Sequence, residues 1–356
     1  MNPLDAEDLR ARVHKVLEAF LSRQVEALES VSPDCAVLVE AVSDLVRGGK
    51  RLRPAFCYWG WRGAGGADGE EIVAAAAAME FFQAAALIHD DLMDGSDTRR
   101  GMPALHRRFE ALHRNAGWAG PGDRFGAAGA LLAGDLCLVW SDELFASSGL
   151  SFGAVGRGRV VFDRMRTQLM AGQYLDILEQ AVATGGSGPV ERARRVIRYK
   201  SAKYTIEHPL LIGGLLADAD ANLLAAYSAY GLPLGEAFQL RDDVLGVFGD
   251  PALTGKPAGD DLREGKRTVL VAETLARATA EQAALVRRRL GDPSLDEAAI
   301  EELREVIRSS GALAAVEALI TSLVGQARAA LAGSGPAEPA REALAALVDA
   351  ATSRAR

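Results

Sequence analysis

Apolar residues recur at helical spacing along most of the 356-residue chain. In residues 17–31, for example, Leu17, Phe20, Leu21 and Leu28 fall on one stripe, as they would on a helix with one buried face. Runs of β-branched and aromatic residues with the two-residue period of a strand are almost absent, and alanine and leucine dominate. The pattern therefore predicts an all-α protein of roughly ten or more helices.

Short segments rich in glycine and proline separate the predicted helices. They lie at residues 62–70, 115–123, 184–189 and 333–339. Each has the length of a turn between neighbouring helices rather than of a linker between domains. We therefore expect a single large domain over residues 1–356, with C-terminal helices in residues 269–356 and a last helix that follows a flexible break.

The composition suits a protein with a large core and a small anionic ligand. Hydrophobic residues make up 49% of the chain and charged residues 25%. The formal net charge of -8 argues against a nucleic-acid partner, because phosphate backbones are bound by basic surfaces. A small anion needs only a local cationic or metal-filled site, so the net charge does not exclude one.

The cysteines and the N-terminal residues give no sign of a disulfide-bonded, zinc-binding or secreted protein. The three cysteines are widely spaced, with no CxxC pair, which argues against a disulfide scaffold or a zinc site. Residues 1–15 are charged and lack the apolar core of a secretory signal. The most apolar stretch, residues 72–88, is interrupted by Glu80 and Gln83 and falls short of the roughly 18 uninterrupted apolar residues of a spanning helix. We expect a cytoplasmic protein without a transmembrane segment.

Three aspartates crowd the end of this apolar stretch. Asp90 and Asp94 are four residues apart and would share one face of a helix, with Asp91 beside them. Such like-charge pairs destabilise a helix by about 0.2–0.5 kcal/mol, and negative charge at a helix C-terminus also opposes the macrodipole. The cluster is either a solvated acidic helix end or the ligand set of a cation. All-oxygen ligands favour Mg²⁺.

A second acidic segment spans residues 238–268. Its polar residues include Gln239, Asp242, Asp243, Lys256, Asp260, Asp261 and Lys266. Gln239 and Asp243 are four residues apart, so an amide and a carboxylate would share one helix face. An ordinary charged loop is the alternative. The repetition of acidic residues followed by basic ones instead favours several Mg²⁺ ions held around one polyphosphate.

Two basic segments complete the pattern. Residues 47–56, "RGGKRLRPAF", hold Arg47, Lys50, Arg51 and Arg53 around a glycine pair, which makes an anion cradle plausible. The segment "YKSAKYT" adds Lys200 and another lysine. Solvated surface charge is the alternative for both segments.

Together these segments resemble the trans-isoprenyl diphosphate synthases, also called the polyprenyl synthetase family, and most of all the bacterial geranylgeranyl diphosphate synthases. The resemblance rests on "GGKRLRP", "DDLMDGSDTRRG", "GQYLD", "YKSAKYT" and "QLRDDVLGVFGDPALTGKPAGDDLREGKRT", in the family's order across residues 47–268. It implies a helical bundle with a central cavity and a homodimer, although a heteromer stays open. The implied reaction condenses isopentenyl diphosphate with an allylic diphosphate.

The resemblance also implies a role for each matching residue. Magnesium, about three ions per active site with substrate bound, would be held by Asp90, Asp91, Asp94, Asp176, Asp242 and Asp243. The allylic diphosphate would be gripped by Arg99, Lys200 and Lys256. Isopentenyl diphosphate would be gripped by Lys50, Arg53 and Arg100, with Gln83 in contact, and the allylic cavity would be lined by Ser201, Gln239 and Lys266. One departure is Gly246, where many relatives have a third aspartate.

Product length is predicted from the helix that ends in the first aspartates. Ala86 and Phe82 lie on the stripe of Asp90, about 6 and 12 Å below it. Family members that stop at farnesyl often have aromatic rings at Ala85 and Ala86, whereas this chain has methyl groups. We expect geranylgeranyl diphosphate, with longer products as the alternative. Phe82 would be the floor, unless it only packs the core and residues 138–140 form the floor instead.

Two other functions share some of these features. A class I terpene cyclase is also all-α with an aspartate-rich helix, but it would not need the cradle around Lys50 and Arg53. A non-catalytic subunit of a heteromeric prenyl synthase tends to lose one aspartate motif, and this chain retains both.

Overall fold

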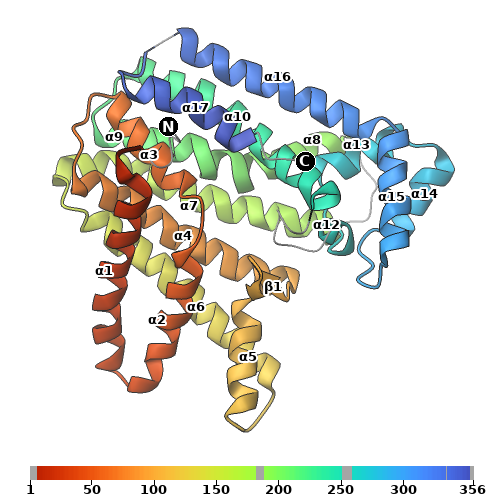
Figure 1. The fold of residues 1–356 in the computed structure, drawn as a ribbon, viewed down its shortest axis with the longest axis horizontal. Coiled ribbons are helices and arrows are strands. Elements are labelled where there is room, and N and C mark those ends of the chain that lie inside the picture. The colour runs from red at the N-terminus through yellow and green to blue at the C-terminus, as the bar shows by residue number, and fades with distance from the viewer. Residues whose placement is uncertain (1–5, 182–187, 251–258, 334, 353–356) are drawn as a thin grey trace.

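The computed structural model describes residues 6–181, 188–250, 259–333 and 335–352. In these residues the chain is almost entirely helical, which confirms the all-α prediction (Figure 1). The α-helices are α1 (Leu9–Glu29), α2 (Ala36–Arg47), α3 (Leu52–Gly63), α4 (Glu70–Asp94), α5 (Leu105–Asn115), α6 (Gly122–Ala146), α7 (Phe152–Ala181), α8 (Pro189–Val196), α9 (His208–Leu216), α10 (Ala221–Phe248), α12 (Asp260–Arg263), α13 (Val269–Arg277), α14 (Ala280–Arg289), α15 (Glu297–Ser309), α16 (Ala312–Gly333) and α17 (Ala340–Thr352).

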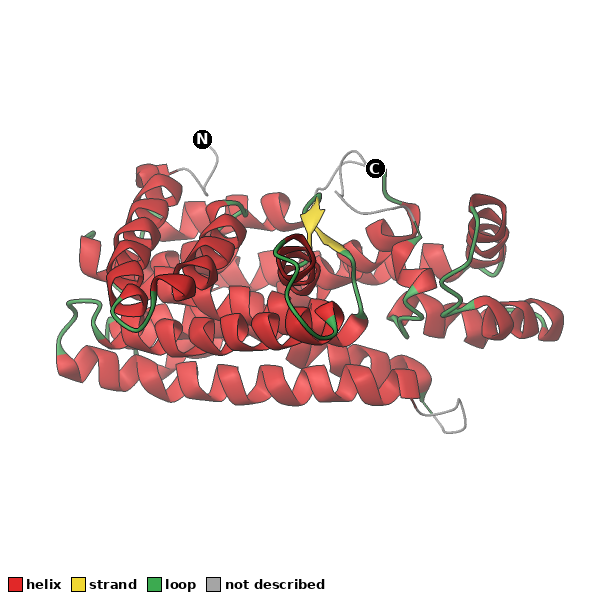
Figure 2. Ribbon diagram, turned by 90° about the horizontal axis from the view of Figure 1, so that it is seen from below, coloured by secondary structure: helices red, strands yellow, loops and turns green. Residues whose placement is uncertain are grey.

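Shorter elements join some of the helices. Two 3₁₀ turns, η1 (Ala6–Asp8) and η2 (Pro33–Cys35), precede α1 and α2. Two short antiparallel strands, β1 (Thr98–Arg99) and β2 (Met102–Pro103), form a hairpin beside α5 (Figure 2). The predicted turns at 62–70, 115–123 and 333–339 are confirmed between consecutive helices, whereas most of the turn at 184–189 lies outside the described residues.

The long helices pack along one another in the middle of the molecule. Figure 1 shows α4, α7 and α10 there, with α16 along one side and α1, α2 and α5 projecting on the other. Helix α4 packs on α6 and α3, and α10 packs on α16. One core surrounds α3, α4 and α6, where the rings of Phe20, Phe81 and Trp140 meet. A second core gathers around α13, α15 and α16. Helix α10 contributes residues to both cores and so connects them. The organisation as a single domain stays a prediction.

Three helices are long and apolar enough to cross a membrane by length and composition alone, namely α4, α6 and α16. In α4, 72% of the most apolar window is buried inside the protein, so this surface is used for packing. The corresponding buried shares are 39% in α6 and 28% in α16. These two helices therefore leave apolar surface outside the core.

A π-helix, η3 (Ile197–Glu207), connects α8 to α9 and carries the segment "YKSAKYT". It is wedged between α7 and α10, and glycines allow the close approach. A Cβ added at Gly172 of α7 would lie 2.6 Å from the backbone nitrogen of Lys200, and one at Gly235 of α10 would lie 2.6 Å from the Cα of Ala202. Short π-helical segments are often found at functional sites, and this one directs Lys200 towards the end of α4.

Candidate active site

The first aspartate cluster lies in the last turns of α4. The helix ends because Gly95 adopts the left-handed conformation, with φ of 67°. The hairpin that follows turns at Arg100 and Gly101, which also have positive φ, and returns Arg99 to the helix. Arg99 Nε donates to Asp91 Oδ1 at 2.8 Å, and Arg99 Nη2 lies 3.4 Å from Asp90 Oδ2. The arginine that follows the aspartates in sequence is therefore their neighbour in space.

Lys200 joins three segments that are far apart in sequence. Its Nζ lies 2.9 Å from Asp90 Oδ1 on α4 and 2.6 Å from Asp176 Oδ2 on α7. Gln173 also donates to Asp90 Oδ1, at 3.0 Å. Burial alone would raise the pKa of Asp90, but the positive charges of Lys200 and Lys266 lower it to about 2. Asp90 is therefore a permanent anion between cations.

Lys266 connects the two acidic segments. Its Nζ lies 2.8 Å from Glu264 Oε2, 3.7 Å from Asp94 Oδ2 and 3.8 Å from Asp261 Oδ1. Ser96, just after α4, donates to Glu264 Oε1 at 3.1 Å. Burial and the neighbouring Asp90 raise the pKa of Asp94 to about 6. The two lysines thus hold together carboxylates that would otherwise repel one another.

One of the two carboxylates that α10 contributes to the site is buried. Asp243 is 6% exposed and accepts a hydrogen bond of 2.8 Å from Gln239, as expected for residues four apart. Burial, and then repulsion by Asp261, raise the pKa of Asp243 to about 8. A Cβ at Gly246 would lie 2.0 Å from Asp261 Oδ2. The Asp261 carboxylate thus occupies the space that a third aspartate of this motif would enter.

The donor set fits Mg²⁺, although it is not a preformed metal cluster. Among the described residues, no group of three or more His, Cys, Asp or Glu side chains converges closely enough to hold a metal. The buried oxygen Asp94 Oδ2 accepts no hydrogen bond, and the Nζ of Lys266 lies 3.7 Å from it. Mg²⁺ takes one or two carboxylates and completes its shell with water and phosphate oxygens. A buried carboxylate oxygen without a hydrogen-bond donor, such as Asp94 Oδ2, suits such an ion.

The basic segment at the start of α3 forms a separate cationic surface. Arg53 Nη2 donates to Thr205 at 2.8 Å, and its guanidinium carbon lies 4.1 Å from the ring centre of Tyr204. Tyr204 in turn donates to the side-chain oxygen of Gln83 on α4. Arg100 Nη1 donates to a backbone carbonyl of α2 at 3.3 Å. The predicted isopentenyl diphosphate residues therefore come from α3, α4 and the hairpin to one place.

The remaining predicted residues differ in how deeply they are buried. Ser201 is half-buried in η3 beside Lys200. Lys50 is exposed in the loop between α2 and α3, and Asp242 is half-buried on α10. Lys256 lies outside the described residues. Along the stripe on α4, Ala85 and Phe82 are fully buried, whereas Ala86 keeps some exposed surface.

The structure adds residues that the sequence reasoning did not single out as ligands or partners. They are Glu80, Gln173, Tyr204, Thr205 and Glu264. Gln173 had a usable signal, because it is three residues before Asp176 and shares its helix face. The contacts of Glu80, Tyr204 and Thr205 had no such signal, because their partners are far away in sequence. Glu264, by contrast, is only two residues from its partner Lys266.

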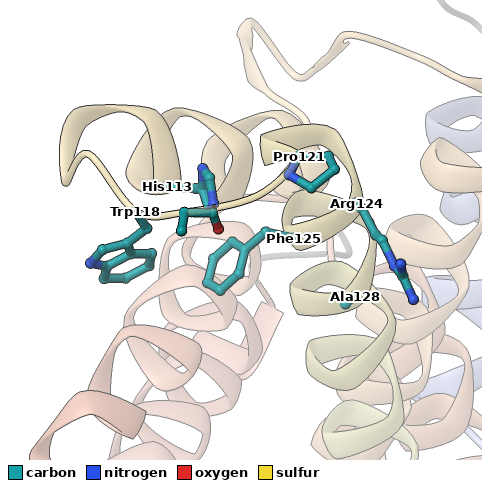
Figure 3. A pocket seen from close by; sticks show the side chains of 7 residues that line it. His113, Trp118, Pro121, Arg124, Phe125 and Ala128 are labelled. Atoms are coloured by element: carbon teal, nitrogen blue, oxygen red, sulfur yellow. Dashed lines mark hydrogen bonds between the residues drawn. The ribbon is translucent and has the colours of Figure 1, made fainter.

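Two further features lie away from these contacts. His89 packs against α6, where a Cβ at Gly134 would lie 2.1 Å from its Nε2. A pocket of about 450 Å³ lies between the end of α5 and the start of α6, and Figure 3 shows its aromatic wall. It is lined by His113, Trp118, Ala119, Pro121, Arg124, Phe125 and Ala128, none of which belongs to the acidic or basic segments above.

Known proteins resemble this chain in both sequence and fold. The family model described as polyprenyl synthetase matches residues 35–307. The chain is 33% identical over 307 residues to the geranylfarnesyl diphosphate synthase of Aeropyrum pernix, covering 84% of this chain and 87% of that protein. It is 30% identical over 349 residues to the nonaprenyl diphosphate synthase of Mycobacterium tuberculosis, covering 98% of this chain and 94% of that protein.

A solved structure agrees with these relatives. The geranylgeranyl pyrophosphate synthase from Corynebacterium glutamicum, complexed with isoprenyl diphosphate and magnesium, matches with a TM-score of 0.93 and 41% identity, covering 97% of this chain and 98% of that chain. The resemblance seen in the sequence motifs is thereby confirmed. Because the family model and the relatives span most of the chain, the protein belongs to the polyprenyl synthetase family, the enzymes that join isopentenyl diphosphate to allylic diphosphates.

Proposed function

We propose that this enzyme makes geranylgeranyl diphosphate from isopentenyl diphosphate and a shorter allylic diphosphate, and that it depends on Mg²⁺. The observation that carries the proposal is the meeting of the two acidic segments around Lys200 and Lys266, next to the separate cationic surface of Arg53 and Arg100. Two anionic substrates need two such sites, one of them rich in carboxylates for metal ions. A terpene cyclase, which has a single diphosphate substrate, would need only one.

In this proposal the carboxylate side binds the allylic substrate. Asp90, Asp91, Asp94 and Asp176, with Asp242 and Asp243 opposite, are the metal ligands, and about three ions are held when substrate is bound. When bound, Mg²⁺ would offset the charge that develops on the departing diphosphate. Arg99 and Lys200, with Lys256, hold the same diphosphate through charge-assisted hydrogen bonds. Ser201, Gln239 and Lys266 line the path of the allylic chain.

The cationic side binds isopentenyl diphosphate through Lys50, Arg53 and Arg100, with Gln83 in contact. The allylic C–O bond breaks, the double bond of isopentenyl diphosphate attacks the resulting cation, and a proton is then lost. The released diphosphate accepts that proton, so no side chain acts as nucleophile or base. The role of the residues is to stabilise charge and to orient the two substrates.

The product length is the part of the proposal that the relatives leave open. Their printed names include geranylfarnesyl, nonaprenyl and farnesyl diphosphate synthases. Geranylgeranyl diphosphate is favoured here by the small side chain of Ala86 one turn below Asp90 and by the bulky Phe82 one turn further. The buried ring of Phe82 packs edge-on against Tyr204, with ring centres 5.6 Å apart, and forms the floor in this proposal.

We also infer a cytoplasmic homodimer. Helices α6 and α7 expose large apolar side chains, among them Leu132, Val139, Phe152, Val160 and Tyr174. An exposed apolar surface of this kind marks a protein–protein or membrane contact. Sedimentation of the purified enzyme tests the dimer, and a monomer at micromolar concentration would contradict it.

The reaction is tested by incubating the purified enzyme with labelled isopentenyl diphosphate, an allylic primer and Mg²⁺. We expect incorporation of label into a C20 product, and loss of activity when the metal is chelated. Asp90→Asn should abolish turnover. Asp97→Asn is the matched control, because Asp97 is an exposed aspartate paired with Arg107 after α4. A product without label, or activity that survives Asp90→Asn, would contradict the proposal.

A further inference from the structure

The loop that carries the cationic surface has an unusual backbone. Between α2 and α3, Gly49 has φ of 113° and Arg51 has φ of 57° with ψ of 34°. The left-handed conformation is unfavourable for a non-glycine residue, because it brings Cβ too close to the following carbonyl oxygen. The conformation of Arg51 therefore needs a compensating interaction.

The side chain of Arg51 provides that interaction by pointing into the protein. It is 3% exposed and forms an ion pair with Glu80 of α4, whose side chain is 8% exposed. Arg51 also donates to the carbonyl of Val46 at the end of α2. One buried guanidinium thus ties the end of α2, the loop and α4 together. A buried ion pair gives little net stability, because desolvation offsets its attraction, so its main contribution here is geometric.

The same pair borders the groups assigned to isopentenyl diphosphate. Glu80 is three residues before Gln83 and so lies on the same side of α4. The guanidinium of Arg100 packs on the loop glycines, with Nη1 3.4 Å from where a Cβ of Gly49 would be. Burial lowers the pKa of Arg100, and the charge of Glu80 opposes that shift. Glu80 is therefore close enough to act on Arg100 as well as on Arg51.

We propose that Glu80 and Arg51 are positioning residues of the isopentenyl diphosphate site. Arg51, although it belongs to the basic segment, does not bind the substrate. It is held by Glu80, and this contact sets the loop so that Lys50 and Arg53 on either side of it face the diphosphate together with Arg100. The inference rests on the proposed function, because it assumes that isopentenyl diphosphate binds to this surface.

The first test is Glu80→Gln in the full-length enzyme, with calorimetric binding of isopentenyl diphosphate and steady-state kinetics. We expect Kd and KM for isopentenyl diphosphate to rise about tenfold or more, while KM for the allylic primer changes little, because only the first site is misaligned. Glu236→Gln is the matched control. Glu236 is equally buried on α10 and pairs with Arg194 and Arg198, away from the loop. It should leave the affinity for isopentenyl diphosphate unchanged.

A second variant separates positioning from stability. In the double variant Arg51→Met/Glu80→Met, apolar side chains replace the whole pair, which often preserves or improves fold stability. We expect a Tm close to that of the wild type with the weak binding of isopentenyl diphosphate retained. If the double variant recovered both Tm and affinity, or if Glu80→Gln behaved like Glu236→Gln, the pair would be only structural.

These outcomes are distinct from a failure of the proposed function. A wild-type enzyme that binds isopentenyl diphosphate without extending a primer would contradict the function and leave the positioning role testable by Kd. A wild-type enzyme that extends the primer, with Glu80→Gln unaffected, would contradict the positioning role alone. No binding of isopentenyl diphosphate by the wild type would overturn both.

Discussion

Replacement of Ala86 by phenylalanine should shorten the product from geranylgeranyl to farnesyl diphosphate. Ala86 lies one helical turn before Asp90 on α4, so its side chain is about 6 Å along the helix from Asp90. A growing chain that starts at Asp90 and follows this face must pass that level. A phenyl ring there would block the chain before the last isoprene unit is added.

The structure distinguishes Ala86 from its neighbour Ala85. Ala86 keeps exposed surface, so a larger side chain can project from α4 without displacing the core. Ala85 is 0% exposed and packs within the core cluster. A phenylalanine at Ala85 should overpack the core and cost about 1–3 kcal/mol. Because family members that stop at farnesyl often have an aromatic ring at this position too, Ala85→Phe is expected to shorten the product as well, but at the cost of a lower Tm than that of Ala86→Phe.

Phe82→Ala tests whether the ring of Phe82 forms the floor that limits product length. Its ring is fully buried against Tyr204, and removal of such a ring costs about 3–5 kcal/mol because it leaves a cavity. The variant should be less stable, and the fraction that remains folded should make longer products. Unchanged product length in a folded Phe82→Ala enzyme would mean that the ring only packs the core.

The assay is chromatography of the dephosphorylated products after incubation with labelled isopentenyl diphosphate and a short primer. Circular dichroism and Tm establish that each variant is folded. The reasoning is refuted if folded Ala86→Phe makes the same product distribution as the wild type, because the chain would then grow along another face.

Three further results are expected. Arg53→Ala should mainly raise KM for isopentenyl diphosphate, and Lys200→Ala should mainly raise KM for the allylic substrate. If initial-rate kinetics showed that both variants raise KM for the same substrate alone, the two-site assignment would be contradicted. Gly246→Ala should raise the Mg²⁺ concentration needed for half-maximal activity, because the new methyl group must displace the Asp261 carboxylate 2.0 Å away; an unchanged metal titration would mean that this carboxylate does not serve the metal site. Burial lowers the pKa of His208 from 6.5 to about 3, so between these values the unfolded chain binds more protons and stability should fall with falling pH, by up to about 1.4 kcal/mol per unit. Urea denaturation at pH 7 and pH 5 should show that His208→Asn loses less unfolding free energy than the wild type between these pH values. Equal losses would refute the lowered pKa of His208.

Local pattern was enough to predict the helical class and most of the turns. The stripe of Leu17, Phe20 and Leu21 and the glycine-rich breaks report on one element at a time, and helical periodicity is a property of neighbouring residues. The same locality explains why Asp90 and Asp94, and Gln239 and Asp243, were correctly expected to share helix faces. Residues four apart on a helix meet whatever the rest of the fold does.

Contacts between distant segments depended on the packing of the helices. From the sequence alone, Lys200 could equally be a surface charge. In the structure, η3 packs against the glycines of α7 and α10 and directs Lys200 to Asp90 and Asp176. Arg51 has the same side-chain chemistry as Arg53, yet one is buried against Glu80 and the other faces Tyr204. Their different positions follow from a backbone turn and from a partner of Arg51 on α4 that is 29 residues away in sequence. Such pairings have no periodicity to reveal them, because they arise only when the helices pack and each buried charge must find a counter-charge.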